Sequence, residues 1–298
     1  MGIGMADVEY LSACGCMLEH SRILDIGAQC LLGVDPESVL RFARSHGPSV
    51  TDEVLNKEAG RIAYFSTVRP GERTTYLSEL IDLTHMEYTS YDVAPALKTD
   101  ILDLNSQTLP VAHRERFDLV LNCGTTEHII NQLNCLRIMH EAAAQDATLF
   151  HQVPTAGYGS HGYFCYHEEF FRDIAQANSY DLADLWYTPV NYAWINAAEL
   201  DLRDPYTPSV QHSAEPMENG GLVPSYNINV VMRKRRSSPF KVPLELATAH
   251  AAPSKQINSA SPADVGYDYR YIRTVTLANV VVGRVAGRGA RVIRRLLS

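Results

Sequence analysis

The sequence predicts an α/β fold, with a mostly parallel sheet of seven strands and helices on both faces. Residues 23–26, after the polar Arg22, form an apolar run with one acid, Asp25, and Gly27 follows at once. Short apolar runs that end in glycine are typical of central parallel strands, because helices cover both faces of such a sheet. Further runs of this kind alternate with helical periodicity along the chain, which indicates strands joined by crossover helices. With 298 residues, 46% of them hydrophobic, the chain is long enough to bury one large core.

The composition leads us to expect a cytoplasmic protein. No apolar run approaches the roughly 20 residues that span a bilayer. The first residues lack the basic start and long apolar segment of a signal peptide. The six cysteines include no Cys-x-x-Cys pair, which favours reduced thiols over a disulfide framework or a zinc site.

Charge is distributed unevenly. Residues 270–298 contain seven arginines and no acid, and the remainder carries 19 basic and 34 acidic residues. An acidic body argues against a nucleic-acid partner. Four arginines of the tail, from 284 to 295, recur at three- and four-residue steps. We therefore expect a basic amphipathic tail that either contacts the inner face of a membrane as a peripheral segment or mediates docking and self-association.

The first half of the chain is rich in helix signals. Residues 5–20 are predicted to be helical. Asp35-Pro36 is typical of a helix start, as is Thr51, and residues 74–83 form a third short helix. The segment 35–85 is thus interpreted as a helical insertion after the first strand, which would lie over the ligand site as a lid or acceptor wall.

The remaining strands and helices follow in alternation. Strands are predicted at 86–91, 97–104, 117–122, 147–153, 181–190 and 226–232, and helices at 130–144 and 168–178. Residues 191–224 are irregular and are interpreted as an acceptor-side insertion. The domain is predicted to span residues 1–236, followed by a linker at 237–269 that is rich in Pro, Ser and Ala.

Three stretches together carry a family resemblance. They are Ile-Leu-Asp-Ile-Gly at 23–27, the acid Asp92 after the second strand, and Phe-Asp-Leu-Val-Leu-Asn-Cys-Gly-Thr-Thr-Glu-His at 117–128. This set resembles the class I S-adenosylmethionine-dependent methyltransferases, which implies a Rossmann-like sheet and S-adenosyl-L-methionine as cofactor. Residues 122–128, together with 161–166, are also similar to methyltransferases of bacterial polysaccharide and natural-product pathways.

The resemblance implies cofactor contacts at the strand ends. Gly27 lets a ligand approach the backbone, Asp25 would face the cofactor ammonium group, and Asp92 would accept bonds from the ribose hydroxyls. Asp103, or alternatively Asp100, would meet the adenine amino group.

Further cofactor contacts are expected around the fourth strand and beside Gly27. Asn122 and Gly124 would line the cofactor or the point of methyl transfer. Gln29 stands where the family usually has a second glycine. It is therefore expected to contact the cofactor, and it is also a departure from the glycine pattern of the family. That departure keeps open a non-catalytic methyltransferase-like binding or scaffold protein.

His128, His161 and Glu127 are the candidate catalytic residues. Methyl transfer is an in-line displacement in which a hydroxyl acceptor benefits from losing its proton, and histidine has a suitable pKa for a base. Glu127 can also simply complement the start of the following helix. The three could ligate a divalent ion, but no pair has a specific ligand spacing, so no metal is predicted.

The resulting functional hypothesis is O-methylation of a sugar hydroxyl, in a surface glycan or a secondary metabolite. The partner would be a small-molecule or glycan acceptor. Transfer to nitrogen or carbon of a small molecule is the enzymatic alternative.

Overall fold

The computed structural model describes residues 2–66, 74–156, 161–189 and 226–243. The predicted insertion 191–224, most of the predicted linker and the basic tail 270–298 lie outside the described residues.

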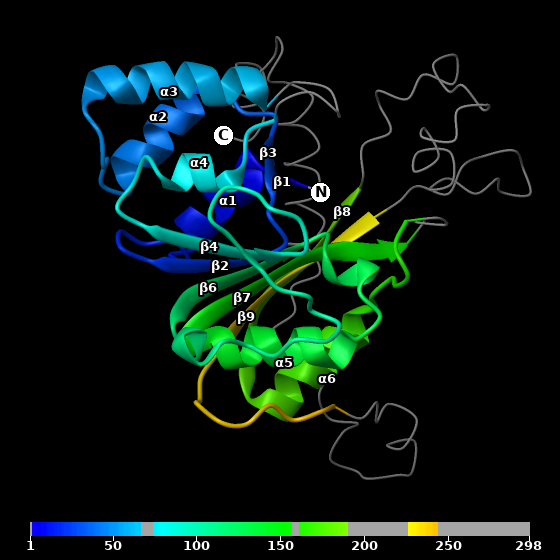
Figure 1. Ribbon diagram of the computed structural model, residues 1–298. Coiled ribbons are helices and arrows are strands. Elements are labelled where there is room, and N and C mark those ends of the chain that lie inside the picture. Colours follow the sequence, from blue (N-terminus) through cyan, green and yellow to red (C-terminus); the bar gives the residue numbers. More distant parts are fainter. Residues whose placement is uncertain (1, 67–73, 157–160, 190–225, 244–298) are drawn as a thin grey trace, which may run out of the picture.

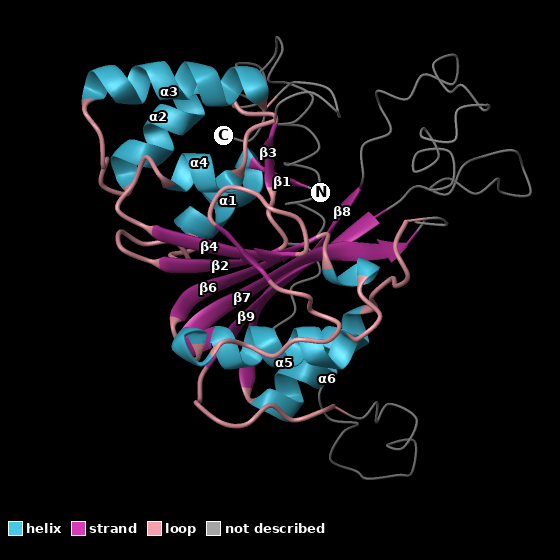
Figure 2. Ribbon diagram, in the orientation of Figure 1, coloured by secondary structure: helices cyan, strands magenta, loops and turns pink. Residues whose placement is uncertain are grey.

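The main sheet has seven strands in the order β5-β4-β2-β6-β7-β9-β8 (Figure 2). Neighbouring strands are parallel, except that β9 is antiparallel to both β7 and β8. The prediction of a mostly parallel seven-stranded sheet is therefore confirmed. Its strands are β2 (Arg22–Ile26), β4 (Glu87–Asp92), β5 (Thr99–Ile101), β6 (Phe117–Cys123), β7 (Ala143–Ala156), β8 (Tyr180–Pro189) and β9 (Tyr226–Lys234).

A second, two-stranded sheet was not predicted. β1 (Gly2–Gly4) pairs in parallel with β3 (Cys30–Leu32), and the chain start thereby lies next to the segment that follows β2. Strands of three residues are too short to show a period of two, and glycine is depleted in strands, so the pattern carries no signal.

Helices cover both faces of the main sheet (Figure 1). One face carries α1 (Met5–Ala13), α2 (Pro36–Ser45), α3 (Asp52–Phe65) and α4 (Leu77–Ile81), and the other carries α5 (Gln132–Ala142) and α6 (Glu168–Asn178). Short 3-10 turns, η1 (Val111–His113) and η2 (Thr126–His128), lie before and after β6. Two predicted helix starts are confirmed by their caps: Asp35 Oδ1 accepts from Ser38 N at 2.9 Å, and Thr51 Oγ1 accepts from Val54 N at 3.4 Å.

The core consists of two layers separated by the sheet. Adjacent residues of one strand belong to opposite layers, as the alternation of a β-strand requires: Ile23 packs with α1–α4, and Leu24 packs with α5 and α6. Phe42, Leu55 and Leu80 of the 35–85 segment are buried in the first layer. The helices of this segment thus cover a face of the sheet.

Several predicted boundaries differ in the structure. The helix predicted at 5–20 ends at Ala13, because Gly15, at φ +68°, turns the chain and Cys16 N returns to Leu11 O. The strand predicted at 147–153 runs from Ala143 to Ala156 and passes through Pro154, where its register with β9 shifts.

The first residues of the predicted linker pack against the domain. Asn178, at the end of α6, donates to Lys241 O at 3.0 Å and accepts from Lys241 N at 2.8 Å. Lys234, at the end of β9, is buried and donates to His140 O and Ala143 O, both at 2.8 Å. These carbonyls lie at the C-terminus of α5, so the lysine caps that helix. Across the described ranges, no helix is both long and apolar enough to cross a bilayer.

Candidate functional site

The turn after β2 lies at the point where the order of the sheet reverses. From β2 the chain proceeds outward to β4 and β5, then returns to β6 on the other side of β2. In open α/β sheets, ligands bind at the carboxyl ends of strands flanking such a point. Gly27 has φ +91°, and a Cβ on it would overlap the hydroxyl of Thr125, just after β6. Only glycine therefore allows the two strand ends to approach this closely.

Gln29 ties the two strand ends together. Its buried side chain donates from Nε2 to Gly27 O and to Thr125 Oγ1, each at 3.2 Å. Its Oε1 is buried and has no hydrogen-bond partner among the described residues. The residue that departs from the family pattern thus braces the turn and leaves one acceptor unsatisfied.

Asp25, which the sequence led us to expect at the cofactor ammonium group, lies beneath the turn and is fully buried. Its Oδ2 accepts from the Tyr88 hydroxyl at 2.6 Å and from Gln29 N at 3.3 Å. Its Oδ1 has no hydrogen-bond partner within the described part of the chain. Burial raises the pKa of the Asp25 carboxyl to about 8. Two buried acceptors, Asp25 Oδ1 and Gln29 Oε1, are thus left without donors in the segment that forms the turn.

Asp92 lies where the sequence places it, at the end of β4 and beside the turn. Its Oδ2 accepts from Ala28 N at 3.2 Å and its Oδ1 from Ala94 N at 3.0 Å. The carboxylate is half-buried and stays accessible at the edge of the sheet.

Asp103, expected at the adenine amino group or as a local cap, has a local role in the structure. It accepts from the Ser106 hydroxyl at 2.6 Å and from Asn105 N at 2.9 Å, and these bonds lower the pKa of its carboxyl. Both of its oxygens are thus used in the turn that follows β5. Asp100 is exposed on β5.

Asn122 is buried and braces the loop after β6, although we expected it to line the ligand. Its Nδ2 donates to Thr126 Oγ1 at 2.9 Å and lies 3.0 Å from His151 Nδ1, and its Oδ1 accepts from Thr126 N at 3.3 Å. Burial lowers the pKa of His151 to about 3, so this ring is neutral and accepts the amide proton. Gly124, in the same loop, has φ +74°.

The structure brings Glu127, His128 and His161 together into one cluster, which we call the Glu-His-His cluster. Glu127 Oε1 lies 3.8 Å from His128 Nε2 and 3.7 Å from His161 Nε2. The Glu127 side chain is 1% exposed, against 39% and 30% for the two histidines. The imidazole rings stand edge to face, with centroids 4.8 Å apart. Burial lowers the pKa of His128, and the Glu127 carboxylate acts in the opposite direction.

A glycine fixes the loop that carries His161. Gly162 has φ +72°, and a Cβ on it would lie 2.8 Å from Glu127 Cγ and 2.9 Å from Glu127 O. Tyr163 N then donates to Glu127 O at 2.6 Å. The loop after β7 is therefore held directly against η2.

A cavity of about 250 Å³ opens at the cluster. Its surroundings are acidic, since the carboxylates of Asp25, Asp7 and Glu127 each raise the pKa of the Cys123 thiol after the larger effect of burial. The Glu127 carboxylate in its wall favours a cationic ligand or a cationic reacting centre. Its lining combines the ends of β6, β7 and β9 with the chain start: Gly2, Cys123, Gly124, Glu127, Gln152, Pro154, His161 and Asn227.

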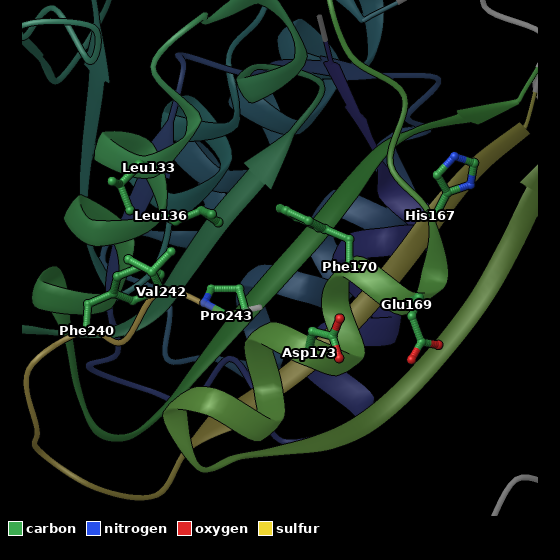
Figure 3. A pocket seen from close by; sticks show the side chains of 9 residues that line it. All are labelled: Leu133, Leu136, His167, Glu169, Phe170, Asp173, Phe240, Val242 and Pro243. Carbon is green, nitrogen blue, oxygen red and sulfur yellow. The ribbon is translucent and has the colours of Figure 1, made fainter. Parts of the chain in front are cut away.

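A larger cavity, of about 460 Å³, lies between α5 and α6 (Figure 3). Leu133, Leu136 and Phe170 line it, together with Phe240 and Val242 from the segment after β9. It shares no lining residue with the cavity at Glu127. Its lining is mostly apolar and includes none of the predicted cofactor or catalytic residues, so it is not the candidate site.

Two tyrosines hold the site, and sequence reasoning missed the first of them, Tyr88. Tyr88 donates to Asp25, and its place opposite β2 follows from a strand register that composition does not encode. Tyr166 is buried and donates to Thr126 Oγ1 at 3.0 Å, which supports η2 from the loop after β7.

No protein-family model and no curated protein matches the sequence. Among solved structures, the chain is similar to the YcgJ protein from Bacillus subtilis (13% identity, 78% of this chain and 99% of that one, TM-score 0.44). It is also similar to a putative sarcosine dimethylglycine methyltransferase from Galdieria sulphuraria (11% identity, 76% and 83%, TM-score 0.45). A coclaurine N-methyltransferase bound to N-methylheliamine and SAH matches with 14% identity, 77% and 72% coverage and a TM-score of 0.41. The strand order of this chain, and not these likenesses, carries the description of its fold.

Proposed function

We propose that this protein is an S-adenosylmethionine-dependent methyltransferase that acts on a hydroxyl group of a small-molecule acceptor, with a sugar as the favoured class. One observation carries the proposal. At the reversal point of the sheet, a glycine turn flanked by unsatisfied acceptors lies beside the Glu-His-His cluster, because Gly27 contacts Thr125 just after β6.

The residues of the turn fit the cofactor. Asp25 Oδ1 and Gln29 Oε1 are buried oxygens without a hydrogen-bond partner among the described residues, and an ammonium group, which offers several donors, would favour the ionised form of Asp25. Both atoms are covered, so contact with a cofactor requires Gln29 to move. Asp92 is the accessible carboxylate at the next strand end and would hold the ribose hydroxyls. When bound, the cofactor supplies a sulfonium methyl group for an in-line displacement.

The Glu-His-His cluster would handle the acceptor. Its cavity of about 250 Å³ is close to the 300 Å³ at which ligand pockets begin and would admit part of a small molecule such as one sugar ring. The two half-exposed histidines border solvent, while Glu127 is held beneath them. This arrangement suits an acceptor hydroxyl that must lose its proton during transfer. The similarity of residues 122–128 and 161–166 to methyltransferases of polysaccharide and natural-product pathways favours a sugar.

Calorimetry with S-adenosylmethionine and S-adenosylhomocysteine tests the cofactor. We expect saturable binding to the wild type and at least tenfold weaker binding to Asp92→Asn. Asp103→Asn is the matched comparison: the local bonds of Asp103 predict no change, whereas the original adenine hypothesis predicts a loss. Absence of binding to the wild type would refute the enzyme and favour a non-catalytic scaffold protein.

The acceptor is tested by S-adenosylhomocysteine release with a panel of nucleotide sugars, free sugars and matched amino sugars. Product analysis by NMR identifies the methylated atom. Transfer to oxygen supports the proposal. Transfer only to nitrogen or carbon would overturn the hydroxyl assignment while leaving the cofactor proposal intact.

The role of the basic tail and the location of the protein are proposed from the sequence alone. A cytoplasmic protein whose tail 270–298 contacts an anionic membrane surface would reach a lipid-linked acceptor. Flotation with anionic liposomes, compared between the full chain and a version without residues 270–298, tests this contact. Equal soluble fractions would leave docking or self-association as the role of the tail.

A further inference from the structure

We propose that Glu127, His128 and His161 bind a divalent transition-metal ion of the zinc class. The role of this ion in methyl transfer rests on the proposed function. The sequence did not predict a metal, because the histidines are 33 positions apart and show no ligand spacing. The fold brings the three residues close together although they are distant in the sequence.

The possible ligand atoms lie close together. One donor atom from each of the three residues lies within 4.8 Å of the other two. Two ligands bound tetrahedrally at ~2.1 Å from Zn²⁺ lie about 3.4 Å apart. The Glu127 Oε1 to Nε2 distances of 3.7 and 3.8 Å exceed this by only a few tenths of an ångström. Both rings are partly exposed, which leaves room for the shift that closes the site.

Glu127 provides the second, independent observation. Both of its carboxylate oxygens are buried, and neither has a hydrogen-bond partner among the described residues. A buried carboxylate without hydrogen bonds is costly, and a metal ion is one of the few partners that can offset the cost. The loop after β7 packs directly on this residue: Tyr163 N donates to Glu127 O, and a Cβ on Gly162 would overlap Glu127 Cγ.

The ligand set defines the class of ion and the open position. Two imidazoles and one carboxylate suit Zn²⁺ and neighbouring divalent ions, and three protein ligands leave a position for an exchangeable oxygen. Glu127 and His161 line the cavity of about 250 Å³, so that oxygen would come from water or from an acceptor hydroxyl.

In the proposed step, the acceptor hydroxyl oxygen occupies the open position and releases its proton to solvent. Coordination lowers the pKa of such an O–H group. A lone pair of that oxygen forms the C–O bond to the cofactor methyl group. The C–S bond breaks, its electron pair stays on sulfur, and the sulfonium becomes a neutral thioether. The ion keeps its charge throughout.

A second group of possible ligands serves as the matched control. Glu19, His20 and His85 also lie within 4.8 Å of one another, but all three are exposed, at 52%, 73% and 43%. The Glu19 carboxylate accepts from His85 at 3.0 Å and is solvated. This group has no buried side-chain atom that lacks a hydrogen-bond partner, and we expect the group to bind metal weakly.

Metal binding is measured on the full-length protein after dialysis against a chelator, by calorimetry with ZnCl₂ and by the visible absorption of Co²⁺. We expect one tight site in the wild type and in His85→Ala. Glu127→Gln and His161→Ala should bind at least tenfold more weakly, while their thermal transitions stay cooperative. No tight site in the wild type, or unchanged affinity in Glu127→Gln, would overturn the proposal.

A glycine pair tests the geometry without removing a ligand. Gly162→Ala places a methyl group against Glu127 and should weaken Zn²⁺ binding at least tenfold. Gly33 has a similar positive φ (+62°), but there is open space where a Cβ would lie, so Gly33→Ala should leave Zn²⁺ binding unchanged. Equal affinities in both variants would contradict the proposed geometry.

Cofactor binding, measured on the same samples, separates the two proposals. Cofactor binding without metal binding refutes only the metal site. Metal binding without cofactor binding refutes only the methyltransferase.

Discussion

The protonation of Asp25 predicts a pH-dependent loss of stability that one substitution should abolish. The carboxyl is fully buried, and burial raises its pKa to about 8, against about 3.9 in an unfolded chain. Between these values the folded chain holds a proton that the unfolded chain has lost. The contribution of Asp25 to stability is therefore complete below about pH 4 and declines as the pH rises toward 8.

The magnitude follows from the two pKa values. Each pH unit within this window costs about 1.4 kcal/mol, so the free energy of unfolding should fall by roughly 3 to 4 kcal/mol between pH 5 and pH 8 on account of Asp25 alone. Asp25→Asn keeps the shape of the side chain and an acceptor for the Tyr88 hydroxyl but does not titrate. The variant should lose that much less stability over the same interval.

The assay is urea denaturation at half-unit steps from pH 5 to pH 8, without cofactor or metal. Other titrating groups affect both proteins equally, so the difference between the two curves isolates Asp25. Asp52→Asn is the control, because that side chain is 84% exposed and its loss should not change the slope. Parallel curves for wild type and Asp25→Asn would refute the reasoning.

Three further predictions concern single contacts. Glu127→Gln should raise the stability of the metal-free protein by about 1 to 3 kcal/mol, because it removes a buried charge whose oxygens accept no hydrogen bond among the described residues; saturating Zn²⁺ should raise the melting temperature of the wild type only, by calorimetry. Gly27→Ala should weaken cofactor binding at least tenfold, whereas Gly15→Ala, at φ +68° with open space, should leave it unchanged. Lys234→Met should lower the free energy of unfolding in urea by roughly 2 to 4 kcal/mol, since it leaves two carbonyls at the end of α5 without their donor.

The sheet was predictable because strands that are buried on both faces consist mostly of apolar residues. Residues 23–26 and 117–122 are mostly apolar, each with one acid, and are followed by glycine or a polar turn, so their position at the centre of a parallel sheet follows from composition. The caps of α2 and α3 were predictable for a similar reason, because Asp35 and Thr51 act within three residues of their partners.

The details of the site depend on contacts distant in sequence. Nothing in the turn itself indicates that Gln29 would reach Thr125, which lies 96 positions away. Asp25 and Asn122 were expected to face a ligand because they stand at strand ends. Strand position fixes the edge but not the direction of a side chain, and both point into the protein and brace the turns. His128 and His161 were correctly expected at the same edge, but their approach to one carboxylate depends on Gly162.

The position of β9 has a consequence for how the protein is made. This strand is the last described one in the chain, yet it lies inside the sheet, and β8 is joined to the other strands through it. Until residues 226–234 have been synthesised, β7 ends the sheet with an unpaired edge, and β8 has no strand beside it in the described part of the fold. Exposed edges of this kind invite pairing between chains. A chain truncated before β9 should therefore aggregate, and the sheet can be completed only after residue 234 has been synthesised.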